Sequence, residues 1–270
     1  MIRLRQRAFV SAAAATLLAL AVACSSGESG DSNVGVEPAA TAAASATIDA
    51  APDRFAGAGE RLSADEREVA NAMLAAFPLL DPTLRTINLR ELVYGAIRDE
   101  IPALTDPPLL SQEVMDQFIH PEEPVISVEA GGEARAYPVQ ILLFHEVVND
   151  VIGDVPVLIS YCPLCNTAIV FDRRVEGEAR TFGVSGLLRQ SDLVMYDHQT
   201  ESLWQQITGE ALVGEAVGAK LTFLPSQTVS WRDFRATFPD AMVLSINTGY
   251  VRPYGETSFV QYDRVGTTPD

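Results

Sequence analysis

The segment Tyr161-Cys162-Pro163-Leu164-Cys165 carries the two cysteines that lie outside the N-terminal region of the chain. Two thiols separated by two residues can bind a metal ion, react as a redox dithiol or close a short disulfide. In a thioredoxin-like site the motif opens a helix, whose N-terminal dipole lowers the pKa of the first thiol. Here residues 167–171 are mainly β-branched or aromatic and predict a strand. This pattern weakens the redox interpretation and keeps the other two open.

A metal-binding turn is the interpretation that the neighbouring residues favour. Such a turn needs a left-handed residue after the second cysteine, and Asn166 belongs to the few non-glycine types that tolerate positive φ. Two thiolates leave a tetrahedral site incomplete. Of the three histidines, His120, His145 and His198, we take His145 as the third ligand, because it lies just before the strand that delivers Cys162. A Cys₂His set suits copper(I) or zinc, and the sequence suggests no other cofactor.

Polar residues close to these ligands in the sequence are candidates for orienting them or for binding a small ligand. Glu146 and Asp150 are the candidate orienting carboxylates, with Asn149 between them. A second polar group follows further along the chain: Ser185, Ser191, Asp192, Asp197, Trp204 and Gln205. From it we select Ser185, Asp197 and Trp204 as candidate ligand-binding residues. Core packing of Trp204 and turn formation by Asp197 are the alternative interpretations.

The N-terminal residues predict export and lipid anchoring. Three arginines within the first seven residues precede an uncharged stretch, 8–23, that ends in small residues, as in a signal peptide. This stretch is short for a membrane span of about 20 residues. The sequence Leu20-Ala21-Val22-Ala23-Cys24 resembles a bacterial lipobox. We therefore expect removal of residues 1–23 and acylation of Cys24, which would hold the protein on the extracytoplasmic membrane surface.

Composition divides the remaining chain into a tether and a body. Residues 24–58 are mostly small or polar and cannot bury enough apolar surface to offset their ordering entropy. Residues 59–270 are enough for a single globular domain.

The net charge of −17 repels phosphate backbones and argues against nucleic-acid binding. The one lysine, Lys220, does not lie in a phosphate-binding loop, and residues 183–186 depart from the serine-hydrolase elbow. No protein partner is indicated.

The body predicts an α+β fold with a mostly antiparallel sheet core, helices on the N-terminal side and one near the C-terminus. A capping box at Ser63 and Glu66 begins the first helix. Further helical patterns lie at 88–97, 111–119, 139–149 and 231–238. The expected strands are 125–128 and 133–137 around a Gly-Gly turn, 155–161, 168–173 paired with 181–184, 193–196 with 202–207, and 242–246.

Several longer motifs resemble the domain of unknown function 3179 family. They are His145-Glu146-Val147-Val148-Asn149-Asp150, Tyr161-Cys162-Pro163-Leu164-Cys165, Thr181-Phe182-Gly183-Val184-Ser185-Gly186, Asp192-Leu193-Val194-Met195-Tyr196-Asp197 and Ser202-Leu203-Trp204, with Ile101-Pro102-Ala103-Leu104 and Ala136-Tyr137-Pro138. The resemblance covers about residues 85–255. It implies a bacterial or archaeal protein, often exported, without an established activity. His145, Cys162 and Cys165 fall on motif positions, whereas His198 and Asn166 stand where the family usually has arginine and glycine.

Three functions therefore stay open on the sequence alone. The first is an envelope lipoprotein that binds copper or zinc through Cys162, Cys165 and His145. The second is a thiol-disulfide protein in which Cys162 attacks and Cys165 resolves. The third is a ligand-binding module with a structural disulfide. The sequence names no substrate or reaction, so it leaves open whether the protein is an enzyme.

Overall fold

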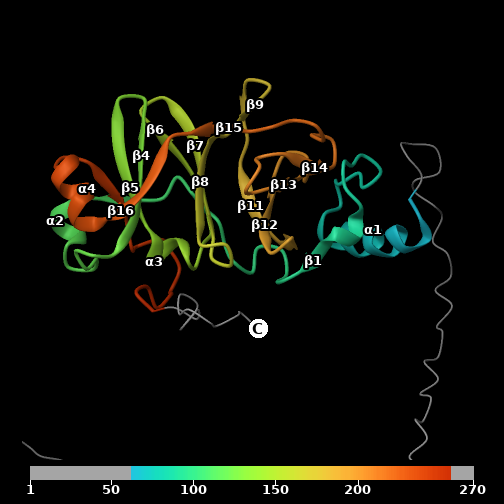
Figure 1. Cartoon of the computed structure of the whole chain (residues 1–270), viewed down its shortest axis with the longest axis horizontal. Coiled ribbons are helices and arrows are strands. Elements are labelled where there is room, and N and C mark those ends of the chain that lie inside the picture. Colours follow the sequence, from blue (N-terminus) through green and yellow to red (C-terminus); the bar gives the residue numbers. More distant parts are fainter. Residues whose placement is uncertain (1–61, 257–270) are drawn as a thin grey trace, which may run out of the picture. The chain divides into compact units, whose positions relative to one another are not determined.

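Three five-stranded sheets, which we name A, B and C, are layered between helix α1 (Ala64–Ala76) on one side and helices α2 (Gln112–Met115) and α4 (Trp231–Thr237) on the other (Figure 1). The computed structural model describes residues 62–256, which belong to one unit of the chain. The predicted signal peptide, Cys24 and the linker to residue 58 lie outside the described residues. Within the part of the chain described, no helix is long and apolar enough to cross a membrane.

Sheet A is antiparallel throughout and lies next to α1. Its order is β1 (Leu92–Tyr94), β11 (Phe182–Arg189), β12 (Asp192–Asp197), β13 (Leu203–Gln205) and β14 (Ala211–Val213). A β-bulge interrupts the β11–β12 register between Val184 and Leu187. At its end the pair closes in a tight turn, because Arg189 is the partner of Asp192.

Sheet B lies in the middle and carries both cysteines of the body. Its order is β15 (Thr222–Leu224), β8 (Thr167–Asp172), β7 (Val155–Cys162), β6 (Val147–Ile152) and β2 (Leu104–Thr105), with β2 parallel to β6. Sheet C has the order β16 (Ser226–Ser230), β4 (Pro124–Ala130), β5 (Glu133–Pro138), β17 (Met242–Leu244) and β3 (Leu109–Leu110), with β17 parallel to β5. The mostly antiparallel core confirms the predicted α+β class.

The short elements connect these layers. They are the 3₁₀ helix η1 (Leu89–Glu91), helix α3 (Val139–Leu142) and the hairpin β9 (Arg174–Val175) and β10 (Glu178–Ala179).

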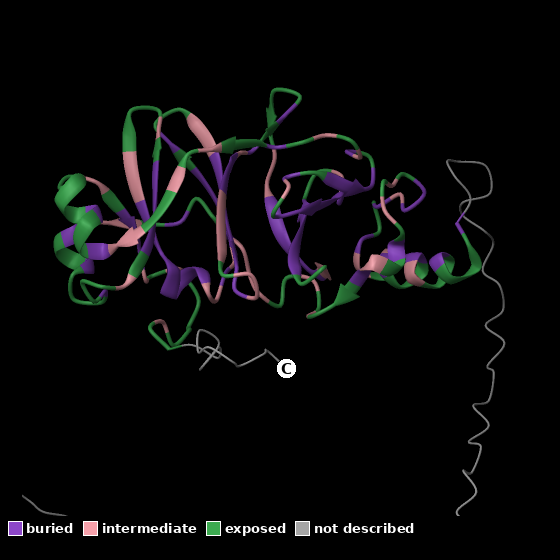
Figure 2. Ribbon diagram, in the orientation of Figure 1, coloured by how far each residue is buried: buried purple, intermediate pink, exposed green. Residues whose placement is uncertain are grey.

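Strand β7 separates two hydrophobic cores, because alternate side chains of a strand point to opposite faces. Val157, Ile159 and Tyr161 belong to the core between sheets B and C. Leu158 and Cys162 belong to the core between sheets B and A. Burial follows this layering, with the buried residues on the strands that face one another and exposed residues on the outer faces of α1 and α4 (Figure 2).

Two adjacent buried residues of β6 connect sheet B to its neighbours, one to sheet A and the other to sheet C. The Asn149 side chain accepts a hydrogen bond from the Phe182 N–H and donates one to the Phe182 carbonyl oxygen, both at 2.8 Å. Asp150 points to the other face, where it accepts a hydrogen bond from the Tyr137 hydroxyl and pairs with Arg135. Each side chain satisfies polar groups that would be costly to bury alone.

Several element predictions are confirmed. Helix α1 begins with the Ser63–Glu66 capping box, and the hairpins β4–β5 and β12–β13, helix α4 and strand β17 lie where the sequence indicates. Of the pattern at 111–119, only α2 forms a helix.

Three other element predictions are wrong. Residues 88–97 form η1 and then β1, which completes the edge of sheet A. Of residues 139–149, only α3 is helical, because Glu146 adopts φ +56° and the chain then enters β6. Strand β8 pairs with β7 and β15, whereas Phe182–Arg189 joins sheet A.

Candidate metal centre

The two cysteines lie where β7 runs into the turn before β8. Cys162 is the last residue of β7 and pairs with Thr167. Within the turn, the N–H of Cys165 donates to the Cys162 carbonyl oxygen at 3.2 Å, and that of Asn166 donates to the Pro163 carbonyl oxygen at 3.3 Å. Asn166 has φ +47°, as predicted for the residue after the second cysteine. This turn brings both sulfurs to one end of sheet B.

A second turn, from sheet A, meets the cysteines. Residues 190 and 191 connect β11 to β12 and have φ of +54° and +63°, the pattern of a type I′ turn. Neither is glycine or asparagine, the residues this turn prefers. The carbonyl oxygen of Ser191 lies 3.3 Å from the Cys165 sulfur and 3.8 Å from that of Cys162. The turn therefore carries the start of β12 directly to the thiols.

Asp192, the first residue of β12, completes a group of three side chains. One ligand atom of each of Cys162, Cys165 and Asp192 lies within 4.8 Å of the others, and we call them the Cys-Cys-Asp group. The Sγ atom of Cys165 is 3.7 Å from Oδ1 of Asp192. Cys162 is 1% and Asp192 3% exposed, while Cys165 is half-buried. Cys165 is thus the member of the group that is partly exposed to solvent.

Hydrogen bonds fix the orientation of the Asp192 carboxylate. Its Oδ2 atom accepts from the Ile207 N–H and from Nε2 of Gln205, both at 3.0 Å. Gln205 is itself held by Arg189, whose Nη1 donates to Oε1 of Gln205 at 2.7 Å. These contacts leave Oδ1 directed at Cys165, as a metal-binding carboxylate needs.

Burial disfavours the charged form of every member of the group. It raises the pKa of the Cys162 thiol and of the Asp192 carboxyl. Burial, together with Cys162 and Asp192, raises the pKa of Cys165 to about 12. A cation bound among these groups would reverse these shifts, because opposite charge favours the ionised forms. The raised pKa values of both thiols argue against a reactive thiolate at neutral pH.

His145 is not part of this group. Its Nδ1 lies 2.7 Å from the Pro102 carbonyl oxygen and its Nε2 lies 2.6 Å from the hydroxyl of Tyr254. Tyr254 packs against the core between sheets B and C, whereas Cys162 belongs to the core between sheets B and A. The left-handed turn at Glu146 separates the ring from the strand that follows it. Among residues 62–256, the third group beside the thiols is Asp192 and not the predicted imidazole.

Burial lowers the pKa of His145, so the ring is neutral at pH 7. A neutral imidazole with Nδ1 facing a carbonyl oxygen must donate from Nδ1, and Nε2 then accepts from the Tyr254 hydroxyl. The Tyr254 oxygen also lies 2.6 Å from the hydroxyl of Thr248. In this arrangement the imidazole fastens residues 247–256 to the body.

The other polar residues selected from the sequence contact groups elsewhere. Asn149 and Asp150 connect layers, as described above. Asp197 accepts from Nε1 of the buried Trp204 at 2.8 Å and pairs with Arg180. Ser185 donates to the Val194 carbonyl oxygen and accepts from the Leu187 N–H beside the bulge in β11. Glu146 is half-buried, and burial raises its pKa to about 7.

Sequence reasoning placed Asp192 in the second polar group but did not connect it with the cysteines. The connection depends on the packing of sheet A against sheet B, which no local pattern encodes. One local signal was available: Gln190-Ser191 lies between two apolar stretches with hairpin spacing, which indicates a polar turn next to Asp192.

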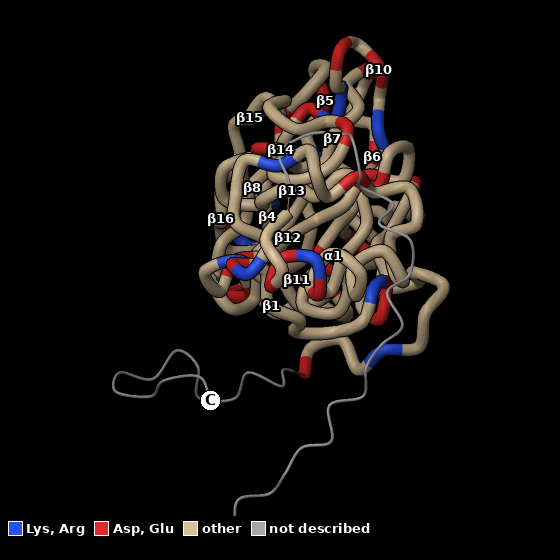
Figure 3. The backbone as a smooth tube through the Cα atoms, turned by 90° about the vertical axis from the view of Figure 1, so that its right-hand side faces the viewer, with Lys and Arg blue, Asp and Glu red and all other residues tan. Residues whose placement is uncertain are grey.

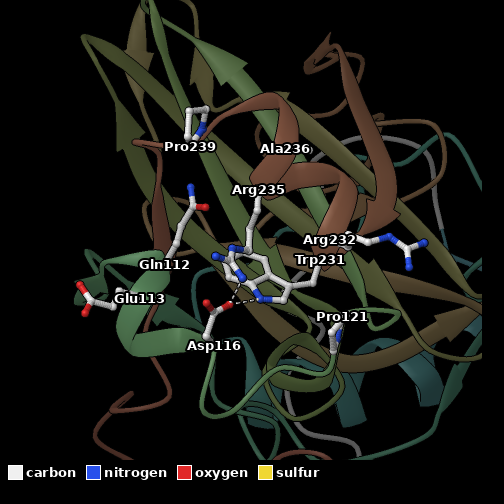
Figure 4. Close-up of a pocket in the computed structure, with 9 residues that line it drawn as sticks. All are labelled: Gln112, Glu113, Asp116, Pro121, Trp231, Arg232, Arg235, Ala236 and Pro239. Atoms are coloured by element: carbon white, nitrogen blue, oxygen red, sulfur yellow. Dashed lines mark hydrogen bonds and ion pairs between the residues drawn. The ribbon is translucent and has the colours of Figure 1, made fainter.

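A cavity of about 560 Å³ is lined by none of the residues of the Cys-Cys-Asp group. It lies between α2 and α4 on the outer side of sheet C (Figure 4). Asp116 accepts from Nε1 of Trp231 at 2.9 Å and from Arg235 at 2.6 Å (Figure 4). The polar groups that point toward one another here pair among themselves, so the contacts account for helix packing.

The fold and the site define a layered, β-rich α+β protein with a buried carboxylate beside a Cys-x-x-Cys turn. The model of the family described as protein of unknown function (DUF3179) matches residues 98–269, and the chain belongs to this family. The match contains the whole Cys-Cys-Asp group. No curated protein and no solved structure matches the chain.

Proposed function

We propose that this protein binds a zinc ion through Cys162, Cys165 and Asp192. The observation that carries the proposal is the convergence of two thiols and one buried carboxylate within 4.8 Å. The three side chains come from two turns on different sheets, so the whole stack of layers positions them. Three side-chain ligands are the number found in zinc sites that keep a further position for an exchangeable ligand.

The buried carboxylate is the strongest argument for a cation. Buried charges in proteins are paired or coordinate metals, because an unpaired charge is costly to remove from water. Asp192 forms no ion pair with lysine or arginine among the described residues. The guanidinium of Arg189, which donates to Gln205, pairs with Glu91. A metal ion would supply the missing positive charge.

The mixed donor set favours zinc over the other ions considered. Zinc accepts thiolate sulfur and carboxylate oxygen in one tetrahedral site. Copper(I) prefers soft sulfur ligands, and magnesium and calcium prefer oxygen ligands only. Replacing the expected imidazole of His145 by the carboxylate of Asp192 therefore moves the balance from copper toward zinc.

A thiol-disulfide function receives less support from the same geometry. Redox-active cysteines have lowered thiol pKa values, commonly at a helix N-terminus. Here both cysteines lie in a β-turn and burial raises both pKa values. Both are free thiols in the structure.

The proposed setting is the extracytoplasmic membrane surface, with Cys24 as the lipid-bearing residue. The net charge of −17 fits cation binding, because an acidic protein raises the local concentration of cations. Acidic residues are spread over the described chain rather than gathered at one place (Figure 3). A Cys24→Ala variant would be released from the membrane fraction, and persistence of this variant in membranes would contradict the anchor.

Elemental analysis and native mass spectrometry of the purified protein test the metal proposal. We expect one zinc per chain in the wild type and none in Cys162→Ser or Asp192→Asn. Asp150→Asn is the matched control, because Asp150 is also a buried carboxylate but lies on the opposite face of sheet B. Retention of zinc by Asp192→Asn, or its absence from wild type after incubation with zinc, would remove the proposal.

A further inference from the structure

Gln206 has an unexplained buried acceptor. The residue is 0% exposed, and its Oε1 is the one buried side-chain nitrogen or oxygen between residues 62 and 256 that has no hydrogen-bond partner. Native proteins pair nearly all such atoms, so an exception needs a cause, such as a bound water or ion. The amide cannot simply be turned over, since Nε2 donates to the Thr167 carbonyl oxygen at 3.1 Å and Oε1 in that place would face another acceptor.

Gln206 contacts the start of the strand that follows the thiols, and its two neighbours in the chain hold Asp192. Its side chain binds Thr167, which is the cross-strand partner of Cys162. The Thr167 hydroxyl donates to the Cys165 carbonyl oxygen at 2.9 Å. On the other side, the residues before and after Gln206 in the chain both donate to Oδ2 of Asp192. Gln206 thus joins the strand that holds the thiols to the segment that holds the carboxylate.

Among the described residues, the group has three side-chain ligands and no fourth. Zinc sites take cysteine, histidine and acidic side chains, and sites with three of these bind water in the remaining position. A metal-bound water has two protons to donate and needs buried acceptors around it. An acceptor of this kind is what Gln206 offers.

We propose that Gln206 is a positioning residue that accepts a hydrogen bond from a zinc-bound water, so that the site keeps an exchangeable fourth position rather than closing as a structural zinc site. This inference rests on the proposed zinc binding by the Cys-Cys-Asp group. The protein then belongs to the class of zinc proteins whose metal ion can bind a ligand from solution. That ligand would approach past the half-buried Cys165.

Two substitutions separate positioning from a merely structural role. Gln206→Leu removes the acceptor, whereas Gln206→Glu keeps an acceptor of the same length and adds negative charge. Both variants lose the hydrogen bond from Nε2 to the Thr167 carbonyl oxygen, so that loss is common to them and does not account for a difference between them. A neutral acceptor stabilises bound water more than bound hydroxide, so its loss lowers the pKa of the water, whereas a carboxylate raises it. A structural defect would not shift this pKa in opposite directions.

Cobalt(II) replaces zinc as the spectroscopic probe. The visible spectrum of the cobalt-loaded full-length protein is recorded as a function of pH. We expect a wild-type ionisation midpoint that moves down in Gln206→Leu and up in Gln206→Glu. Zinc affinity, measured by competition with a chromophoric chelator, falls about 10- to 100-fold in Gln206→Leu. Gln140→Leu is the matched control with unchanged affinity, because Gln140 is a buried amide in α3 that donates to the Phe118 carbonyl oxygen.

The outcomes distinguish the two levels of the proposal. A wild-type cobalt spectrum that does not change with pH, or midpoints that stay equal in both variants, would overturn the role of Gln206 and leave zinc binding intact. If Gln206→Leu fails to fold, the upward shift in Gln206→Glu decides the question alone. Failure of wild type to bind zinc or cobalt would remove the proposed function and this inference together.

Discussion

The Sγ atom of Cys165 lies 3.7 Å from Oδ1 of Asp192, although the two residues are 27 positions apart and belong to turns of different sheets. The contact exists because sheet A packs on sheet B through a shared core that includes Cys162 and Leu193. A carboxylate held beside two thiols without a basic partner is the relationship from which the zinc proposal follows.

Replacing Asp192 by asparagine should separate metal affinity from stability. We expect zinc affinity to fall by more than about 100-fold, because the loss of hydrogen-bonding partners of ligands alone costs 10- to 100-fold. Without metal the variant should be more stable than wild type at pH 8. Burial raises the pKa of Asp192, so its ionisation costs folding free energy as pH rises through that pKa, and asparagine removes this cost.

Chelator competition and urea unfolding of the metal-free proteins measure these two effects. At a pH below the unfolded-state pKa of aspartate, the stability difference between wild type and Asp192→Asn should shrink, because the proton is then bound in both states. A metal-free variant less stable than wild type at pH 8 would contradict the buried-charge argument.

Zinc affinity should rise steeply with pH. Both thiols have raised pKa values and are protonated without metal at neutral pH. Binding releases these protons, so the zinc Kd should fall by up to about tenfold per pH unit for each thiol proton released, about a hundredfold for two. Isothermal titration in buffers of different ionisation enthalpy counts the protons. A Kd that does not depend on pH between 6 and 8, roughly the range in which free thiols stay protonated, would mean that the thiols do not ligate.

Glu146 should make the body less stable as pH rises, independently of the metal. Burial raises its pKa from 4.5 to about 7 in the folded state. Its ionisation therefore costs nothing below the unfolded pKa, and the cost grows through the folded pKa. Glu146→Gln should raise the free energy of unfolding by about 3 kcal/mol at pH 8, since each pKa unit corresponds to about 1.4 kcal/mol, and leave it nearly unchanged at pH 4.

Urea unfolding at both pH values measures the effect, with Glu129→Gln as the control at an exposed position of β4. Equal stabilisation by Glu146→Gln at both pH values would assign the gain to something other than charge burial.

The turn between β11 and β12 should be open to stabilisation without harm to the metal site. Gln190 and Ser191 occupy left-handed positions that asparagine and glycine prefer. Each strained residue costs on the order of 1–3 kcal/mol, and the entropy that glycine adds to the unfolded chain offsets part of the gain from removing this strain. The double variant Gln190→Asn/Ser191→Gly should therefore raise the free energy of unfolding by about 1 kcal/mol.

Zinc affinity of the double variant should equal that of wild type, because the backbone carbonyl at 191 is retained. A loss of affinity would show that a side chain of this turn takes part in binding. Thermal unfolding and chelator competition provide the two measurements.

Local features of the sequence predicted local structure well. The capping box of α1, the Gly-Gly hairpin of sheet C and the left-handed residue at Asn166 depend on short-range hydrogen bonds and φ preferences. The strand after Cys165 follows from its β-branched and aromatic residues, and it directed the interpretation away from a thioredoxin-like helix.

Long-range pairing was the part that local reasoning missed. Residues 181–184 have the same strand character whether they join β8 or β12, so composition does not choose between them. The same gap explains the third ligand. His145 is close to Cys162 along the β6–β7 pair, but a single left-handed residue at Glu146 turns its ring to the other core, and Asp192 approaches from sheet A instead.

Zinc K-edge X-ray absorption of the loaded wild-type protein tests the central claim most directly. A site built from Cys162, Cys165, Asp192 and water predicts two sulfur scatterers at about 2.3 Å and two oxygen scatterers at about 2.0–2.2 Å, without the outer-shell scattering of an imidazole. Four light-atom ligands without sulfur, or a clear imidazole contribution from His145, would contradict the account.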